Sequence, residues 1–381
     1  MVELQPSKLA MRVRSPSPAP GVRFWARPPK EDLIMRAVVV TADQSVEVLD
    51  VADPTLPGPD GAIIEVDATA ICGSDLHLYH GVLPSIGIQP GHEVVGRIIE
   101  VGPDVRERRV GDRVLVSAVV GCGHCDQCRR GDPVSCRVTG PIALGTTPDV
   151  HGGQAEYLAV PAVDLFTLVI PEGVSTENAL LLTDILPTGF LGAQMGAIQP
   201  GDTVAIFGMG PVGIMALASS KLYGPSRIIA VDVVPERLAR AEAMGAIPVD
   251  ASGEMGALGV LEATGGLGAN VAIEAVGHQQ TISDALSCVG PRGRVSMVGV
   301  NLDMDFPFPM ALAFLKALEF RAAFAAIPST WANLVPLVTE GRLDLSDVFT
   351  HRMGLSEAPE AYRLFDQRED GILKVLLDPK A

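Results

Sequence analysis

A glycine-rich turn at residues 208–213 constrains the fold of this chain more than any other stretch. The segment DTVAIFG before it is typical of a short buried strand, and VGIMALASSKL after it carries apolar residues almost all round a helix. Between them Gly208, Gly210 and Gly213 form the pattern G-x-G-x-x-G. Such glycines permit a tight turn and the close approach of a pyrophosphate to the helix N-terminus. The context predicts a dinucleotide-binding unit, and a Gly-rich turn in some other α/β unit is the alternative.

The next predicted strand, RIIAVD, ends at Asp232. An acidic residue at this separation in sequence from the glycine turn usually binds the adenosine ribose of the cofactor. A carboxylate accepts hydrogen bonds from the ribose hydroxyls and repels a 2′-phosphate, so NAD is predicted rather than NADP. Arg237 could bind a phosphate instead, but we place it on the first turns of the next helix, near the adenosine ribose. Further strand–helix pairs around NVAIEAVG and GRVSMVGV predict a doubly wound parallel sheet.

A second unit is predicted from Met35 onward, because 381 residues exceed a single ordinary core. Short β-branched runs alternate there with Gly and Pro, as in an antiparallel, barrel-like domain. The predicted strands lie in MRAVVV, SVEVLDV, GAIIEVDATAIC, VVGRIIEVG, GDRVLVSAVV and QAEYLAV.

Four cysteines within this unit predict a structural zinc site. Cys122, Cys125, Cys128 and Cys136 are separated by two, two and seven residues, so their thiolates can converge on one tetrahedral ion. A disulfide knot is disfavoured without a secretory signal, and the closely spaced bacterial iron–sulfur pattern would end in Cys-Pro. A closed site of this kind orders a lobe and leaves no position for substrate. The sixth cysteine, Cys288, is predicted to be a buried core residue.

The stretch ICGSDLH, followed by GHE, supplies ligands of the kind that a catalytic zinc uses. Cys72 offers a thiolate and His92 an imidazole, and a third ligand must come from elsewhere. Asp184 lies in LLTDILPTGF, a segment too apolar to hold a buried carboxylate without a partner. Each residue also has a purely structural interpretation: Cys72 as a small core residue, His92 as a hydrogen-bonded histidine at the start of a strand, and Asp184 as a helix N-cap.

Charge excludes some classes of partner. A net charge of −16 and a pI near 4.8 argue against binding to nucleic acid or to an anionic membrane. No uncharged apolar run reaches the roughly eighteen residues of a membrane span. We therefore expect a soluble, cytoplasmic protein. Residues 1–34 are rich in Pro and Arg and lack any period, which predicts a disordered extension or a translation start at Met35; a targeting peptide is less favoured.

From Met35 to the C-terminus the chain resembles the zinc-dependent medium-chain alcohol dehydrogenases. The segments LLTDILPTGF and HGGQAEY look like those of the formaldehyde dehydrogenase-like bacterial branch. The resemblance implies an α/β protein in which a GroES-like β-barrel catalytic domain, residues 35–185 and 324–381, surrounds a Rossmann domain, residues 186–323.

The resemblance also implies roles for single residues. Cys72, His92 and Asp184 would bind the catalytic zinc. Glu93 matches a glutamate that approaches the metal during ligand exchange, and Asp75 resembles a partner that orients the histidine ligand.

Three further positions match residues at the family's cofactor site. Ser74 and His77 match a hydroxyl and an imidazole that relay the alcohol proton to solvent through the nicotinamide ribose. Thr188 matches a threonine beside the nicotinamide.

The predicted activity is hydride transfer between a small alcohol, or an aldehyde hydrate, and NAD, with two zinc ions per chain. A formaldehyde dismutase with tightly held NAD and a polyol or threonine dehydrogenase are the enzymatic alternatives. Outside enzymes, the chain could be a silent cofactor-binding protein; a nucleic-acid module is opposed by its charge. We expect a homodimer or homotetramer, with LDMDFPFPMALAFLKAL as the candidate contact.

Overall fold

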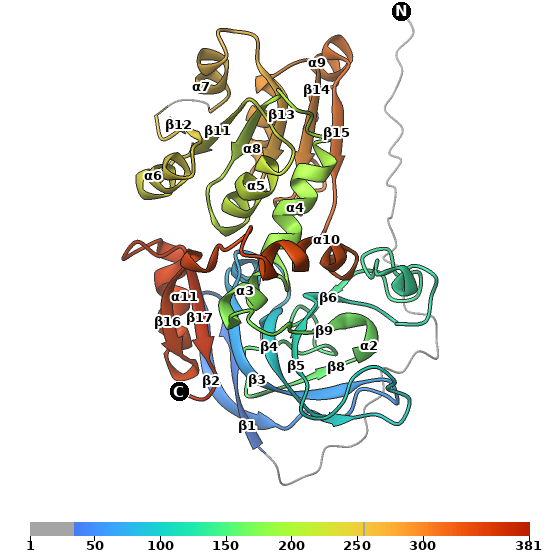
Figure 1. Cartoon of the computed structure of the whole chain (residues 1–381). Coiled ribbons are helices and arrows are strands. Elements are labelled where there is room, and N and C mark those ends of the chain that lie inside the picture. The colour runs from blue at the N-terminus through green and yellow to red at the C-terminus, as the bar shows by residue number, and fades with distance from the viewer. Residues whose placement is uncertain (1–33, 254–255) are drawn as a thin grey trace, which may run out of the picture.

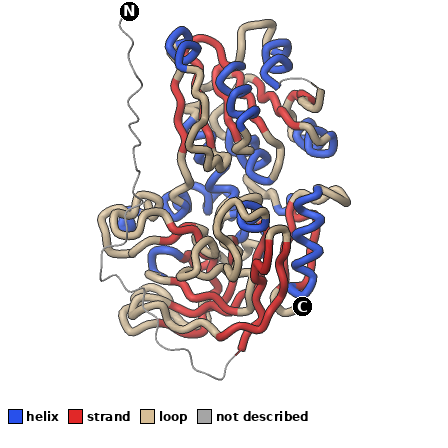
Figure 2. Tube along the Cα trace, turned by 180° about the vertical axis from the view of Figure 1, so that it is seen from behind, coloured by secondary structure: helices blue, strands red, loops and turns tan. Residues whose placement is uncertain are grey.

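The computed structural model describes residues 34–253 and 256–381. They form an upper and a lower lobe, with the C-terminus on the lower one, as Figures 1 and 2 show from opposite sides. The predicted extension lies outside the described residues except for Ile34, which is the first residue of strand β1. Within the described ranges no helix combines the length and apolarity needed to cross a membrane.

The upper lobe is built on a parallel sheet in the order β12-β11-β10-β13-β14-β15. The order reverses between β10 and β13, which makes this the topological switch point of a doubly wound sheet. Apolar residues on both faces of the sheet pack against helices in two separate clusters. The predicted Rossmann architecture is confirmed. Its strands are β10 (Thr203–Phe207), β11 (Arg227–Asp232), β12 (Ile247–Asp250), β13 (Ala269–Glu274), β14 (Val289–Met297) and β15 (Glu319–Ala322).

Each helix of this lobe except α4, which precedes β10, follows one of its strands, as the alternating pattern predicts. Helix α5 is buried almost all round, and Cys288 at the end of α8 is fully buried, which confirms both predictions. The helices are α4 (Ile185–Met195), α5 (Pro211–Lys221), α6 (Pro235–Ala243), α7 (Gly256–Ala263), α8 (Gln279–Cys288) and α9 (Met310–Lys316).

The lower lobe contains a seven-stranded sheet in the order β16-β17-β3-β4-β5-β9, with β8 also paired to β3. The hairpin β1–β2 and the short pair β6–β7 stand beside it. Its strands are β1 (Ile34–Ala42), β2 (Ser45–Ala52), β3 (Ala62–Ile71), β4 (Glu93–Val101), β5 (Arg113–Val116), β6 (Val119–Val120), β7 (Ile142–Ala143), β8 (Tyr157–Val160), β9 (Thr167–Val169), β16 (Phe349–Gly354) and β17 (Lys374–Asp378).

The strands predicted between Met35 and Val160 pair antiparallel, as expected, whereas β16 and β17, which the prediction did not include, run parallel. Helix α11 (Ala358–Gln367) connects them and returns the chain to the end at which β16 began, as parallel pairing requires. The other helices of this lobe are α1 (Asp75–Tyr79), α2 (Val163–Phe166), α3 (Thr176–Leu181), α10 (Ile327–Thr339), and the 3₁₀ turns η1 (Cys128–Arg130), η2 (Ser346–Val348) and η3 (Leu355–Glu357).

An apolar cluster joins the two lobes. It includes Leu180 of α3, Leu186 of α4, Met215 of α5 and Trp331 of α10. The indole of Trp331 donates a hydrogen bond of 3.0 Å to the carbonyl oxygen of Leu182. Strand β15 ends and α10 begins on either side of residue 324, where we predicted the return to the catalytic domain. The domain boundaries themselves stay predictions.

The glycine turn shows why its third glycine is needed. A Cβ atom at Gly213 would lie 1.7 Å from the carbonyl oxygen of Gly208, so backbone blocks any side chain there. At Gly210 the nearest atom would be Nη1 of Arg237, at 3.7 Å. Helix α5 can therefore approach β10 closely only with glycine at position 213.

We expect Gly213→Ala to lower the free energy of unfolding by about 3 kcal/mol, because the added methyl must displace backbone. Gly210→Ala is the matched control and should cost less than about 1 kcal/mol, since that position has extended backbone angles and open space. Urea denaturation followed by circular dichroism measures both. Equal midpoints for the two variants would contradict the close approach.

Candidate active site and metal centres

The four predicted structural cysteines come together in one cluster. Their sulfur atoms lie within 4.8 Å of one another. The pairs Cys122–Cys128 and Cys125–Cys136 are each 4.0 Å apart. Zinc–sulfur bonds of about 2.3 Å at tetrahedral angles place sulfurs about 3.8 Å apart, so the spacing suits zinc.

Backbone N–H groups point at these sulfurs, but burial still raises the pKa of Cys122 and Cys128, whereas backbone N–H groups lower that of Cys125. The N–H groups of His124 and Cys125 point to Sγ of Cys122, at 3.5 and 3.4 Å. Burial opposes ionisation of Cys136, but the Thr139 hydroxyl and backbone N–H groups lower its pKa to about 6. Cys125 and Cys136 are thus favoured as thiolates, and a zinc ion would supply the positive charge that the other two need in order to ionise.

A second cluster brings together Cys72, His92, Glu93 and Asp184, whose ligand atoms also lie within 4.8 Å of one another. Cys72 follows strand β3, His92 precedes β4, and Asp184 stands at the N-cap of α4. Oδ2 of Asp184 lies 3.5 Å from Sγ of Cys72 and 3.4 Å from Nε2 of His92. The aspartate makes no side-chain capping bond, so its carboxylate serves this cluster and not the helix.

The electrostatics of this cluster suit a cation. Burial and the charge of Asp184 raise the pKa of Cys72. Burial also disfavours a charged His92, but Asp75 and Asp184 outweigh it and raise the pKa of that imidazole well above its usual value. A divalent ion would neutralise the thiolate and the carboxylate together, and thiolate, imidazole and carboxylate are the donors that zinc takes.

Glu93 has one free oxygen beside these groups. Its Oε2 is buried without a hydrogen-bond partner, whereas Oε1 lies 2.7 Å from Nζ of Lys374. Both side chains are completely buried. An unpaired buried carboxylate oxygen is costly, and a nearby cation would satisfy it. Glu93 therefore lies where it could reach an ion held by Cys72, His92 and Asp184, and the role that the resemblance implies for it stays a prediction.

Lys374 was missed by the sequence analysis, although a signal was present. It is the one charged residue in the apolar run ILKVLL, and a charge inside a buried strand needs a partner. That partner could not be identified from local sequence, because Glu93 lies 281 residues away.

Ser74 precedes helix α1 and His77 lies within it. The Ser74 hydroxyl is 3.2 Å from Nε2 of His92 and makes no capping bond to the helix. Nδ1 of His77 is 3.3 Å from the carbonyl oxygen of Ser74, and the imidazole is half-buried. The Ser74 hydroxyl thus faces the cluster and does not cap the helix.

Asp75 contacts both sides of the ligand set. Its Oδ1 lies 3.3 Å from Nδ1 of His92, although the two atoms are not aligned as a hydrogen bond. Its Oδ2 accepts a 2.9 Å hydrogen bond from the backbone N–H of Cys72. Thr188, one turn into α4, donates to the carbonyl and carboxylate oxygens of Asp184, at 2.9 and 3.2 Å.

The cofactor residues predicted from the glycine pattern also lie close together. Asp232 ends β11, and its carboxylate accepts hydrogen bonds from the N–H groups of Met209, Val233 and Val234, at 2.5, 2.7 and 2.9 Å. An ionised carboxylate can accept about four, so capacity remains for a ligand. Arg237 is in the first turn of α6, as predicted, and its guanidinium lies beside the glycine turn.

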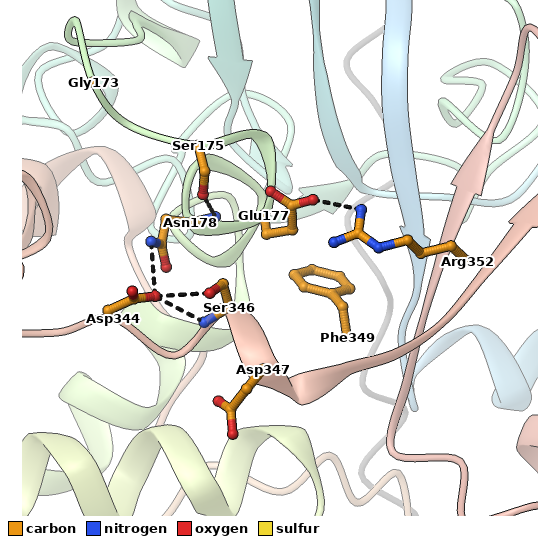
Figure 3. A pocket seen from close by; sticks show the side chains of 9 residues that line it. All are labelled: Gly173, Ser175, Glu177, Asn178, Asp344, Ser346, Asp347, Phe349 and Arg352. Carbon is orange, nitrogen blue, oxygen red and sulfur yellow. Dashed lines mark hydrogen bonds and ion pairs between the residues drawn. The ribbon is translucent and has the colours of Figure 1, made fainter.

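A polar hollow of about 520 Å³ lies elsewhere, between α3, η2 and β16 (Figure 3). Arg352 points across it to Glu177, 2.5 Å away, and Asn178 donates to Asp344 at 3.0 Å. None of its nine lining residues belongs to the metal clusters or to the glycine turn. This hollow is therefore separate from the candidate active site.

Comparison with known proteins agrees with this geometry. The model of the alcohol dehydrogenase GroES-like domain matches residues 58–172, and that of the zinc-binding dehydrogenase matches residues 211–340. The chain is 45% identical over 346 residues to a probable zinc-binding alcohol dehydrogenase of Mycobacterium tuberculosis, an alignment that covers 91% of this chain and 89% of that protein.

Solved structures share the whole architecture. An alcohol dehydrogenase from Thermus sp. ATN1 has a TM-score of 0.84 and 40% identity, covering 90% of this chain and 99% of that one. A putative zinc-binding dehydrogenase from Sinorhizobium meliloti 1021, bound to NADP, has a TM-score of 0.79 and 28% identity, covering 91% of this chain and 100% of that one.

The closer likeness to the formaldehyde dehydrogenase-like branch stays a prediction. The family assignment does not depend on it, because it is supported by both family models and by a relative that spans most of the chain. The chain belongs to the zinc-dependent medium-chain alcohol dehydrogenases, a family of oxidoreductases with a GroES-like domain and a Rossmann sheet.

Proposed function

We propose that this chain oxidises a small alcohol with NAD, or reduces the corresponding aldehyde with NADH, at the cluster of Cys72, His92 and Asp184. The observation that carries the proposal is the convergence of these three zinc-type donors with the Ser74 hydroxyl, which lies 3.2 Å from Nε2 of His92. Metal ligands and a proton-accepting hydroxyl at one point are what alcohol oxidation requires.

The residues divide the work. A zinc ion held by Cys72, His92 and Asp184 would act as a Lewis acid that lowers the pKa of an alcohol hydroxyl, while a bound nicotinamide accepts the hydride. Ser74 would take the hydroxyl proton and pass it outward through the cofactor ribose toward His77. Glu93, with its free oxygen, would approach the ion when ligands exchange.

A second zinc ion belongs to the proposal, held by Cys122, Cys125, Cys128 and Cys136. All four residues supply sulfur, so this site has no open position and would stabilise the loop rather than react. Four-thiolate chelation needs reduced cysteines, and this supports a cytoplasmic location.

We propose NAD as the cofactor, because the carboxylate of Asp232 closes the end of β11 where the adenosine ribose would lie. A 2′-phosphate there would meet a negative charge that three backbone N–H groups hold in place. Arg237 supplies a nearby positive charge, and the NADP-bound relative shows that the family's fold also accepts NADP. The fixed carboxylate favours NAD.

The substrate within the alcohol class is not set by these contacts. Polyols, threonine and hydrated formaldehyde would all present a hydroxyl to the same cluster, and a dismutase that keeps NAD between turnovers would use it too. A screen of NAD reduction over methanol, formaldehyde, primary and secondary alcohols, polyols and threonine distinguishes these substrates. Nothing in the acidic charge supports nucleic acid or an anionic membrane as a partner.

We also propose that the chain pairs with a second copy through the edge of its parallel sheet. Strand β15 is the edge strand, and all four of its residues are exposed. Helix α9 beside it has no buried residue and exposes Met310, Phe314 and Leu315 by 69, 84 and 81%. An exposed edge strand next to large apolar side chains suits burial against another copy.

The first test concerns the two metal sites. Purified wild-type chain should hold about two zinc ions. Asp184→Ala should keep its fold and about one zinc ion but lose alcohol-dependent NAD reduction, because one ligand of the open site is gone. Cys128→Ser should lower solubility or thermal stability, since a closed site contributes folding energy. An Asp184→Ala protein with unchanged zinc content would refute the catalytic site.

The second test concerns cofactor choice. Asp232→Ser should lower the ratio of kcat/KM for NAD to that for NADP, because ribose hydrogen bonds and phosphate repulsion are both lost. Asp250→Ser is a control at the end of the neighbouring strand, where Asp250 pairs with Asp232, and should change the ratio less. A wild-type preference for NADP would contradict this proposal and would indicate that Arg237 binds the 2′-phosphate.

The third test concerns proton transfer. Ser74→Ala should reduce turnover by roughly 10²-fold with zinc retained, since positioned acid–base groups contribute that much. Ser74→Thr keeps a hydroxyl and should restore much of the rate, and His77→Gln should have a smaller effect, because solvent can reach the ribose by another path. Near wild-type turnover by Ser74→Ala, when a deuterium isotope effect shows hydride transfer to be limiting, would assign the proton to water or Glu93.

A further inference from the structure

A chain of buried polar side chains leads from helix α11 to the candidate metal ligands. The Tyr362 hydroxyl lies 2.9 Å from Oε1 of Gln154, and Nε2 of Gln154 lies 3.1 Å from Oδ2 of Asp75. Oδ1 of Asp75 then faces Nδ1 of His92 at 3.3 Å. We propose that Gln154 and Tyr362 are positioning residues, which hold Asp75, and through it His92, in the orientation that binds zinc.

The direction of this chain is fixed by its neighbours. Nε2 of Gln154 also lies 3.3 Å from the carbonyl oxygen of Ala70, and both this oxygen and the Asp75 carboxylate can only accept hydrogen bonds. If the amide were turned over, its oxygen would face two acceptors. Oε1 must therefore face Tyr362, and the tyrosine hydroxyl must donate.

Burial makes each link of the chain matter. Gln154, Tyr362 and Asp75 are 0, 1 and 2% exposed, so water does not readily replace a lost partner. Burial also raises the pKa of Tyr362 well above its usual value, which keeps the hydroxyl protonated as the donor. A donor that cannot be lost to titration near neutral pH suits a positioning role.

The main chain of Gln154 is fixed as firmly as its amide. Its N–H donates to the carbonyl oxygen of Pro90 at 3.1 Å, and its own carbonyl oxygen accepts from Val38 at 2.8 Å. A Cβ atom at Gly91 would lie 2.6 Å from Cγ of Gln154, so the side chain packs against the residue that precedes His92. Gln154 therefore supports both the backbone and the partner of that histidine.

The carboxylate of Asp75 contacts Gln154 and also two of the candidate metal ligands, Cys72 and His92. The oxygen that accepts from Gln154 also accepts from the backbone N–H of Cys72, at 2.9 Å. With that oxygen held from two sides, Oδ1 is presented to Nδ1 of His92, which leaves Nε2 of the ring toward Asp184. Because Oδ1 and Nδ1 are close but not aligned as a hydrogen bond, we assign Asp75 a part in orienting the ring, as carboxylates beside metal-binding histidines do. The inference rests on the proposed catalytic zinc site.

Zinc release to a colorimetric chelator tests the role without using activity. The release phase that is missing from Asp184→Ala identifies the catalytic site, and the four-cysteine site is the internal control. Gln154→Met should accelerate release from the catalytic site by roughly 10-fold. Tyr362→Phe should do so by roughly 3-fold, since it removes one neutral hydrogen bond and keeps the ring.

Tyr79→Phe is the matched control for the tyrosine. Its ring centroid lies 5.4 Å from that of Tyr362 in the same apolar cluster, but it is not part of the polar chain. Release from the catalytic site should be unchanged in this variant. A general loss of packing would instead accelerate release from both metal sites.

A double variant shows whether Gln154 acts through Asp75. In an Asp75→Asn background, Gln154→Met should add little to the release rate, because the carboxylate that it holds is already absent. A full 10-fold addition there, or unchanged release in Gln154→Met alone, would overturn the inference. If Gln154→Met misfolds, Tyr362→Phe is the test, and unchanged zinc release from its catalytic site would overturn the inference. Wild-type chain with zinc at the four-cysteine site alone would overturn the proposed function as well.

Discussion

The structure depends on the burial of several acidic groups in one place, at the junction of its two lobes. Cys72, Glu93 and Asp184 meet there beside an apolar cluster that joins both lobes. Like charges at such spacing destabilise a fold unless cations balance them. His92 and Lys374 supply part of the balance, and a divalent ion would supply the rest. This is why a metal explains the site better than a set of unrelated buried residues.

Two packed helices, α4 and α5, fix the position of the metal cluster relative to the glycine turn. Asp184 begins α4, and the glycine turn leads into α5. The helices pack so closely that a Cβ atom at Gly189 would lie 2.5 Å from the backbone of Met215 and Ala216. A cofactor on the turn and an ion at Asp184 would therefore keep a fixed separation, which hydride transfer needs because reacting atoms must stay within a few ångströms.

Local sequence patterns predicted much of this molecule, and long-range contacts account for what they missed. The glycines, the four cysteines and the strand that ends at Asp232 could be found because each signal is contained in a short segment. Cys72, His92 and Asp184 could be grouped from ligand chemistry and family resemblance. The parallel pairing of β16 with β17 and the roles of Lys374, Gln154 and Tyr362 depend on contacts between distant segments, which a single sequence does not encode locally.

Those missed residues show how the site is completed. Lys374 contacts Glu93 across 281 residues, and Tyr362 contacts Gln154 across 208. Lys374 and Tyr362 belong to the C-terminal segment, which follows all the strands of the parallel sheet in the sequence and lies in the lower lobe (Figure 1). Until α11 and β17 dock, Glu93 would be a buried carboxylate without its cation, and Asp75 would lack the support of the tyrosine chain. The geometry of the proposed metal site would therefore depend on the docking of α11 and β17, even though all of its candidate ligands lie in the first half of the chain.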